Sequence, residues 1–201
     1  RAGAPASRLA HRRLHAIAIP RGAMPGPGWL PGAPVPMLAD GRDWRHAHGC
    51  AMASMRGFGT LDDGRRVHAY RLGHADGLCA EILDLGGILA GLTFSAAGRR
   101  VPLVLGLAEA RAYYADPAYL GIVVGRFGNR IAGSACEIDG HPVRLAANEG
   151  RNHLHGGHCG FGRRIWDVVT HDDSRLVLRY LSPDGEEGYP GTLEITATYR
   201  L

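Results

Sequence analysis

The sequence predicts an all-β protein, an antiparallel β-sandwich. From Gly64 onward, short runs of aliphatic and β-branched residues are separated by turn residues, which is the pattern of short strands. Glycine makes up 30 of the 201 residues, about twice its average usage, and this density favours frequent turns over long helices. Roughly nine strands and one short helix are therefore expected.

The first part of this region shows strand patterns before and after a short helical one. Alternation at 66–72 places Val67, Ala69 and Arg71 on one face of a strand. The run at 122–124 is short and very apolar, as expected of a buried strand. Further strands are expected at 78–85, 88–94 and 101–105, and a helix of one or two turns at 108–114.

Two hairpins and a last strand follow. The segment 134–145 contains Asp139-Gly140, a strong type I′ turn signal because both central residues need a positive φ. A second hairpin joins 166–170 to 176–181 through the turn at 172–174, and 191–201 alternates as a strand. Because this last pattern runs to Leu201 without a turn, we expect a truncated sandwich.

Charge and hydropathy argue against two classes of partner. Residues 1–50 hold seven Arg and two Asp, and subtracting these from 23 basic and 19 acidic residues leaves 16 against 17. The region after residue 50 therefore lacks the basic stripe of a nucleic-acid-binding domain. No apolar run approaches the ~18–20 residues of a membrane helix. We expect neither a nucleic acid nor a membrane as partner.

Residues 1–50 differ in composition from the rest of the chain. They contain seven of the 12 prolines and no steady strand or helix period, so we expect a disordered or non-domain leader; a targeting leader is the alternative. The cysteines are scattered without a C-x-x-C pair, so reduced thiols and a cytoplasmic location are expected: Cys50, Cys79, Cys136 and Cys159.

The segment 125–131 (GRFGNRI) brings polar groups to the end of an expected strand. Asn129 beside Arg130 suits a polyol, because an amide and a guanidinium can both bond neighbouring hydroxyls. A simple turn with solvated or ion-paired arginines explains the same spacing.

The segment 148–162 (NEGRNHLHGGHCGFG) concentrates histidines. In an extended chain His153 and His155 would share one side, with Leu154 pointing into the core. They could bind a metal together with His158 and Cys159, but the usual second ligand pair is missing; lining a sugar cleft is the other interpretation. The glycine spacing does not fit a dinucleotide fingerprint.

The segment 182–191 (SPDGEEGYPG) is a rigid acidic loop. Its carboxylates, Asp184, Glu186 and Glu187, could bind Ca²⁺, but the spacing is not that of an EF-hand. A structural turn with solvated carboxylates is the favoured interpretation.

These segments, in this order and with Ile138-Asp-Gly-His141, Gly160-Phe161 and Trp166 between them, resemble the aldose 1-epimerase (galactose mutarotase) family over about residues 56–201. The resemblance implies a supersandwich fold, no metal or organic cofactor, and an aldose as partner. The implied reaction interconverts the α and β anomers of free hexoses such as galactose and glucose.

The resemblance also implies roles for individual residues. Asn129 and Arg130 would bind sugar hydroxyls, and His155 would contact the sugar near its reacting end and assist catalysis; the three are expected to converge on a pyranose-sized hollow. Arg126 and His153 receive no role. The family's general-acid His and general-base Glu belong to later segments that these 201 residues lack, so we expect the isolated chain to be inactive.

Three alternatives stay open at this level. A non-catalytic carbohydrate-binding β-sandwich would keep the same binding residues. A hexose-6-phosphate epimerase would need a further cationic pocket. A misread product without a stable fold would leave apolar faces uncovered.

Overall fold

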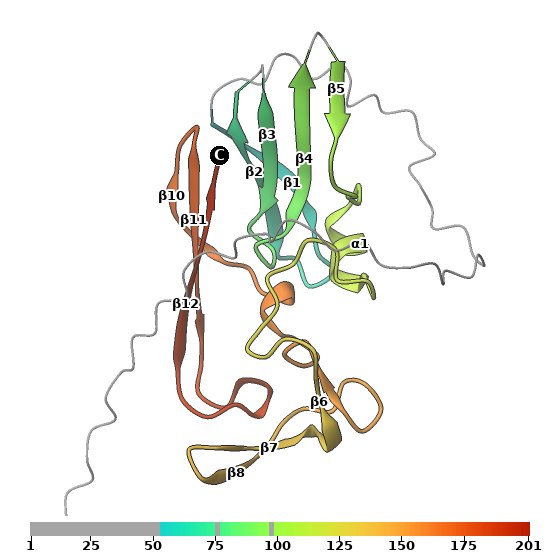
Figure 1. Ribbon diagram of the computed structural model, residues 1–201, viewed down its shortest axis with the longest axis vertical. Helices are drawn as coiled ribbons and strands as arrows, with labels where there is room; N and C mark the ends of the chain where they lie inside the picture. Colours follow the sequence, from blue (N-terminus) through green and yellow to red (C-terminus); the bar gives the residue numbers. More distant parts are fainter. Residues whose placement is uncertain (1–52, 75–76, 97–98) are drawn as a thin grey trace, which may run out of the picture.

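The computed structural model describes residues 53–74, 77–96 and 99–201 (Figure 1). The expected leader at 1–50 lies outside the described residues. The largest unit is a five-stranded antiparallel meander in the order β1-β2-β3-β4-β5. Its strands are β1 (Ser54–Thr60), β2 (Arg66–Gly73), β3 (Leu78–Leu83), β4 (Leu89–Ala96) and β5 (Arg99–Pro102).

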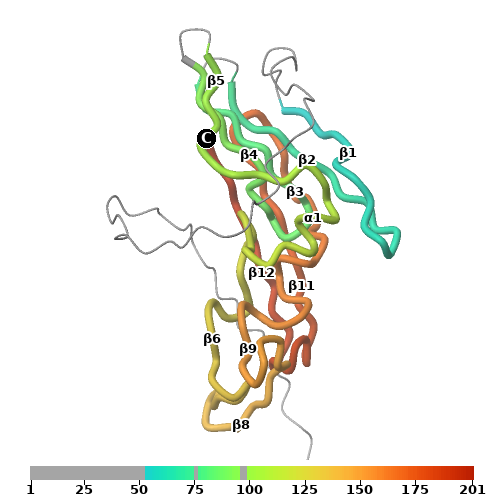
Figure 2. The backbone as a smooth tube through the Cα atoms, turned by 90° about the vertical axis from the view of Figure 1, so that its right-hand side faces the viewer, coloured from blue at the N-terminus to red at the C-terminus, as the bar shows by residue number. Residues whose placement is uncertain are grey.

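A second, three-stranded sheet packs against this meander. It consists of β10 (Asp167–His171), β11 (Arg175–Ser182) and β12 (Leu193–Arg200), paired antiparallel in that order. Figure 2 shows this sheet behind the meander. The all-β sandwich prediction is confirmed, including the hairpin around 172–174 and the last strand.

The two faces of the meander bury different side chains, as a period of two requires. Val67 and Ala69 join one core cluster, together with the helix α1 (Ala110–Ala115). Leu72 on the opposite face of β2 joins the other, which contains Leu176 and Leu178 of β11. The predicted alternation in β2 and the predicted short helix are therefore correct.

The part of the chain that carries the polar segments lies at one end of the sandwich (Figure 1). Two small antiparallel pairs are found here, β6 (Arg130–Ile131) with β9 (His153–Leu154) and β7 (Ala135–Ile138) with β8 (His141–Arg144). Asp139 and Gly140 have φ of 51° and 79°, as predicted for a type I′ turn. The described residues also contain three 3₁₀ turns, η2 (Ala132–Ser134), η3 (Phe161–Arg163) and η4 (Glu186–Gly188).

Two predicted strands differ from the structure. Residues 122–124 form no strand; Val123 instead donates its N–H to Gly86 O at 2.9 Å, so the run crosses the turn between β3 and β4. The run at 101–105 ends as a strand at Pro102, and Leu105 is 77% exposed. Apolar composition predicted burial in both places, but pairing partners and sheet position decided the outcome.

The described part of the chain contains twelve strands rather than about nine, because pairs as short as β6–β9 leave no sequence period. It contains no helix long and apolar enough to cross a membrane. Cys136 and Cys159 are half-buried and form no disulfide, whereas Cys50 lies outside the described residues.

Candidate functional site

The β6–β9 pair brings Asn129, Arg130 and His155 together from segments 26 residues apart. Arg130 lies opposite Leu154 in the register. Just beyond the pair, the His155 N–H donates to Asn129 O at 3.2 Å, and the Asn129 N–H donates to His155 Nδ1 at 3.0 Å. The backbone of Asn129 therefore contacts His155 on both sides of its Cα, and Arg130 is the next residue along the chain.

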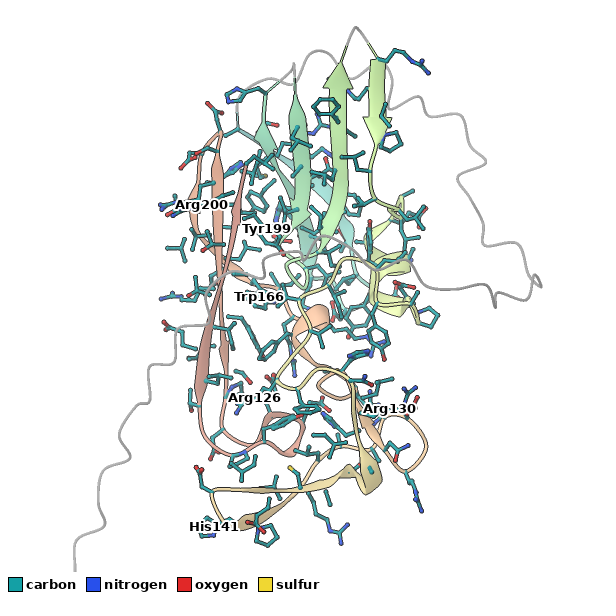
Figure 3. The ribbon with its side chains drawn as sticks, viewed as in Figure 1. Arg126, Arg130, His141, Trp166, Tyr199 and Arg200 are labelled. Atoms are coloured by element: carbon teal, nitrogen blue, oxygen red, sulfur yellow. The ribbon has the colours of Figure 1, made fainter. Side chains whose placement is uncertain are left out.

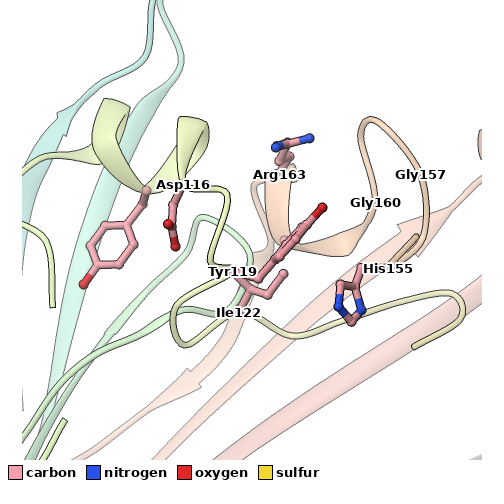
Figure 4. A pocket seen from close by; sticks show the side chains of 9 residues that line it. Asp116, Tyr119, Ile122, His155, Gly157, Gly160 and Arg163 are labelled. Carbon is pink, nitrogen blue, oxygen red and sulfur yellow. The ribbon is translucent and has the colours of Figure 1, made fainter. Parts of the chain in front are cut away.

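The imidazole of His155 is oriented by two contacts. Because Nδ1 accepts from Asn129, the neutral ring carries its proton on Nε2, and Nε2 has no hydrogen-bond partner among the described residues. The ring also meets the ring of Tyr119 edge-on, with centroids 4.8 Å apart (Figure 4). His155 thus presents an N–H donor to a ligand.

His155 lies at a sharp change of chain direction. Its φ is 50°, in the left-handed region that costs a non-glycine residue about 1–2 kcal/mol. The next residue, Gly156, has φ of 87°, and a Cβ there would lie 1.6 Å from Gly125 O. Only glycine allows the chain to turn this close to the 125–131 segment.

Glu149 was not singled out in the sequence, yet it holds Arg130. The Arg130 Nε donates to Glu149 Oε2 at 2.7 Å, and Nη2 donates to Oε1. This fork leaves Nη1 without a partner in the described part of the chain. The hydrogen bond from Arg130 is the main reason why the pKa of Glu149 is lowered, with Asn152 and His155 contributing less.

This pair gives a testable pH dependence. A lowered pKa means that the Glu149–Arg130 attraction is fully present above the ordinary value of 4.5 and is lost as the pH falls through the folded-state pKa. A carboxyl ¹³C NMR titration should give Glu149 a midpoint below 4.5, and Arg130→Gln should move that midpoint upward. An unchanged midpoint in the variant would show that Arg130 is not the cause.

The two residues without an assigned role are structural. Arg126 points towards the loop between β11 and β12, away from Arg130 (Figure 3). Its guanidinium makes five hydrogen bonds, to Ser182 Oγ and to the carbonyl oxygens of residues 182, 183, 190 and 191. All of its donors are used within the fold.

His153 is fully buried and does not share a side with His155, so this prediction was wrong. The Ala146 carbonyl accepts from His153 Nδ1 at 2.7 Å, and Tyr189 Oη lies 2.8 Å from Nε2. Leu154 is only half-buried. The strand β9 ends at Leu154, and the positive φ of His155 breaks the alternation on which the prediction rested.

The acidic loop acts as a structural turn, but its carboxylates are bonded within the fold rather than solvated. Asp184 accepts the Gly191 N–H, Glu186 bonds Tyr180, Ser182 and Arg164, and Glu187 accepts from residues 158 and 159. In the described ranges, no three His, Cys, Asp or Glu side chains are grouped so that they could hold a metal ion.

The hollow beside His155 is narrower than expected. Its volume is about 20 Å³, room for about one water molecule and well below the ~300–1,000 Å³ of ligand pockets. Of the three predicted residues only His155 lines this hollow, and Asn129 and Arg130 lie outside its lining. Sequence reasoning missed Asp116, Tyr119 and Arg163, whose only signal was their place before and after the named motifs. The hollow is lined by Tyr113, Asp116, Tyr119, Ile122, His155, Gly157, Gly160, Gly162 and Arg163 (Figure 4).

Solved structures first define the class of fold. The chain is similar to galactose 1-epimerase from Lactobacillus acidophilus, with a TM-score of 0.62 and 26% identity over 74% of this chain and 44% of that one. An aldose epimerase homologue from C. elegans gives a TM-score of 0.60 and 31% identity over 74% and 42%. The protein is thus a galactose mutarotase-like β-sandwich.

Sequence comparison then shows the family. The family model described as aldose 1-epimerase matches residues 68–201, and the chain belongs to this family. It is 37% identical to aldose 1-epimerase of Escherichia coli K12 over 147 residues, and 39% identical to galactose mutarotase of Sus scrofa over 146. These alignments cover 69% and 72% of this chain. The chain spans about two-fifths of the length of these relatives, 40% and 42%.

Proposed function

We propose that this chain supplies one wall of the sugar site of a mutarotase, an enzyme that interconverts the α and β anomers of free hexoses such as galactose and glucose. The observation that carries the proposal is the convergence of Asn129, Arg130 and His155 at the end of the β6–β9 pair. Family membership supports the same substrate class.

The unpaired groups of this wall are all donors. Asn129 uses Oδ1 to accept the Arg130 N–H, which leaves its NH₂ group. Arg130 keeps Nη1, and His155 keeps Nε2–H. None of these three has a protein partner in the part of the chain that the structure describes. Sugar hydroxyl and ring oxygens are acceptors, which is the chemistry that such donors bind.

Anomerisation needs two further groups. A base removes the proton from the C1 hydroxyl, an acid protonates the ring oxygen, and the opened ring rotates about C1–C2 before closing on the other face. Asn129 and Arg130 hold the sugar in place for this exchange, and His155 donates near the reacting end. We infer that the 201 residues alone bind sugar without enzyme-level turnover, because the family's acid His and base Glu segments are not among them.

Calorimetric titration combined with polarimetry tests the proposal on the 201-residue chain. We expect D-galactose to bind and galactitol, which has no ring, to bind more weakly. Arg130→Gln should weaken the binding of galactose at least about tenfold. This corresponds to ~1.4 kcal/mol, the loss expected when one hydrogen bond from a charged group is removed. Arg144→Gln, on the exposed hairpin strand β8, is the matched control.

Two results would count against the proposal. Absence of galactose binding would remove the sugar-wall assignment. Enzyme-level mutarotation by the isolated chain would show that its acid and base lie within these residues. Binding without mutarotation is the expected outcome. A non-catalytic carbohydrate-binding protein would show the same result. Mutarotation by a protein that includes the acid and base segments distinguishes the two.

A further inference from the structure

We propose that Glu187 of the acidic loop is a positioning residue that holds His155 against Asn129. This inference rests on the proposed function, in which His155 donates to the sugar. Glu187 does not touch the imidazole. It binds the backbone that follows His155, and so it fixes where the ring lies.

The contact is made by a single carboxylate on two successive backbone groups. Glu187 Oε2 accepts the His158 N–H at 2.9 Å, and Oε1 accepts the Cys159 N–H at 2.9 Å. Hydrogen bonds to an ionised acceptor are about twice as strong as neutral ones. The turn that starts at His155 is therefore closed from its far end by one charged side chain.

The same carboxylate limits the space of the turn. A Cβ on Gly157 would lie 2.1 Å from Glu187 Oε2, and a Cβ on Gly156 would lie 1.6 Å from Gly125 O. The two glycines are thus enclosed between Glu187 on one side and the 125–131 segment on the other. The backbone of His155 has little freedom to move away from Asn129 while Glu187 is in place.

Glu187 itself is held from both directions. Its backbone O accepts the Ala146 N–H at 2.9 Å, and its φ of 53° is unusual for a non-glycine residue. Two residues later, Tyr189 Oη lies 2.8 Å from the buried His153, and Arg126 binds the two ends of the loop. Because the loop is anchored in this way, the place of Glu187 is fixed independently of His155. Glu187 can therefore hold the His155 backbone in position.

The test compares three variants of the 201-residue chain. Glu187→Ala removes both acceptors, Glu187→Gln keeps the size and one acceptor, and Glu194→Ala is a matched control on the exposed side of β12. The measurements are the melting temperature, the galactose affinity and the ¹⁵N shifts of the His155 ring. These shifts report whether Nδ1 still accepts from Asn129, which a purely structural role far from His155 would not change.

We expect Glu187→Ala to weaken the binding of galactose by about tenfold or more and to shift the His155 Nδ1 resonance. Glu187→Gln should recover part of both effects, and Glu194→Ala should match the parent chain. If Glu187→Ala does not fold, Glu187→Gln carries the same comparison at a smaller amplitude. A folded Glu187 variant with unchanged ring shifts would overturn the proposal.

The ring shifts also separate this inference from the proposed function. The ring shifts are measured without sugar. If the parent chain fails to bind galactose, the sugar-wall assignment is contradicted, but the ring shifts of the Glu187 variants still test whether Glu187 positions His155.

Discussion

Replacing Gly156 by alanine is expected to destabilise the fold by about 3 kcal/mol or more, the sum of a positive-φ penalty and an overpacking penalty. The new Cβ would lie 1.6 Å from Gly125 O and 2.9 Å from Arg126 N. Both neighbours are backbone atoms, so neither can move aside like the end of a side chain. Relief requires the 125–131 segment and the His155 turn to separate, which also breaks the Asn129–His155 contact.

Urea unfolding followed by circular dichroism measures this effect, with Gly150→Ala as the control. Gly150 has φ of 58°, but nothing lies within 4 Å of a Cβ built on it. Its substitution should therefore show the backbone penalty alone, about 1–2 kcal/mol. Equal losses for the two variants would show that the close approach at Gly156 has no energetic consequence.

Replacing His155 by alanine is expected to have the largest effect on function. In the 201-residue chain, galactose affinity should fall at least about tenfold, because the Nε2–H donor is lost. In a protein that also contains the family's acid and base segments, kcat should fall by on the order of 10²-fold or more if His155 assists proton transfer or orientation.

His158→Ala is the matched control for this substitution. His158 is exposed and lies three residues further on. Among the described residues its imidazole bonds only the Ala147 carbonyl oxygen, with Nε2 at 3.1 Å, and its backbone contact to Glu187 does not need the imidazole. It should leave both affinity and kcat near the parent values. A His155→Ala enzyme in which only KM rises would show that His155 binds the sugar without assisting the reaction.

Much of the fold was predictable because strand alternation and turn chemistry are local. The alternation of Val67 and Ala69 predicted the buried face of β2, and Asp139-Gly140 predicted the turn between β7 and β8. The run at 122–124 was wrongly predicted as a strand, because the Val123 N–H bonds Gly86 O in the turn between β3 and β4 and the position of that turn is not visible in the local pattern.

The grouping of Asn129, Arg130 and His155 was predictable only through resemblance to a family, since spacing alone left a simple turn and a metal site open. The partners of these residues were not predictable. Glu149 contacts Arg130, and Glu187 contacts residue 158, across 19 and 29 residues of sequence. His153 is buried through its contacts to Ala146 and Tyr189. Long-range contacts of this kind leave no periodic pattern.

The most direct test of the sugar wall is a ¹H–¹⁵N NMR titration of the 201-residue chain with D-galactose, observing the side-chain NH₂ of Asn129, the guanidinium of Arg130 and the ring of His155. These three groups are expected to shift together along one binding curve, with the hairpin β7–β8 unaffected. Saturating galactose that leaves all three unchanged, or shifts only groups elsewhere in the chain, would contradict the account.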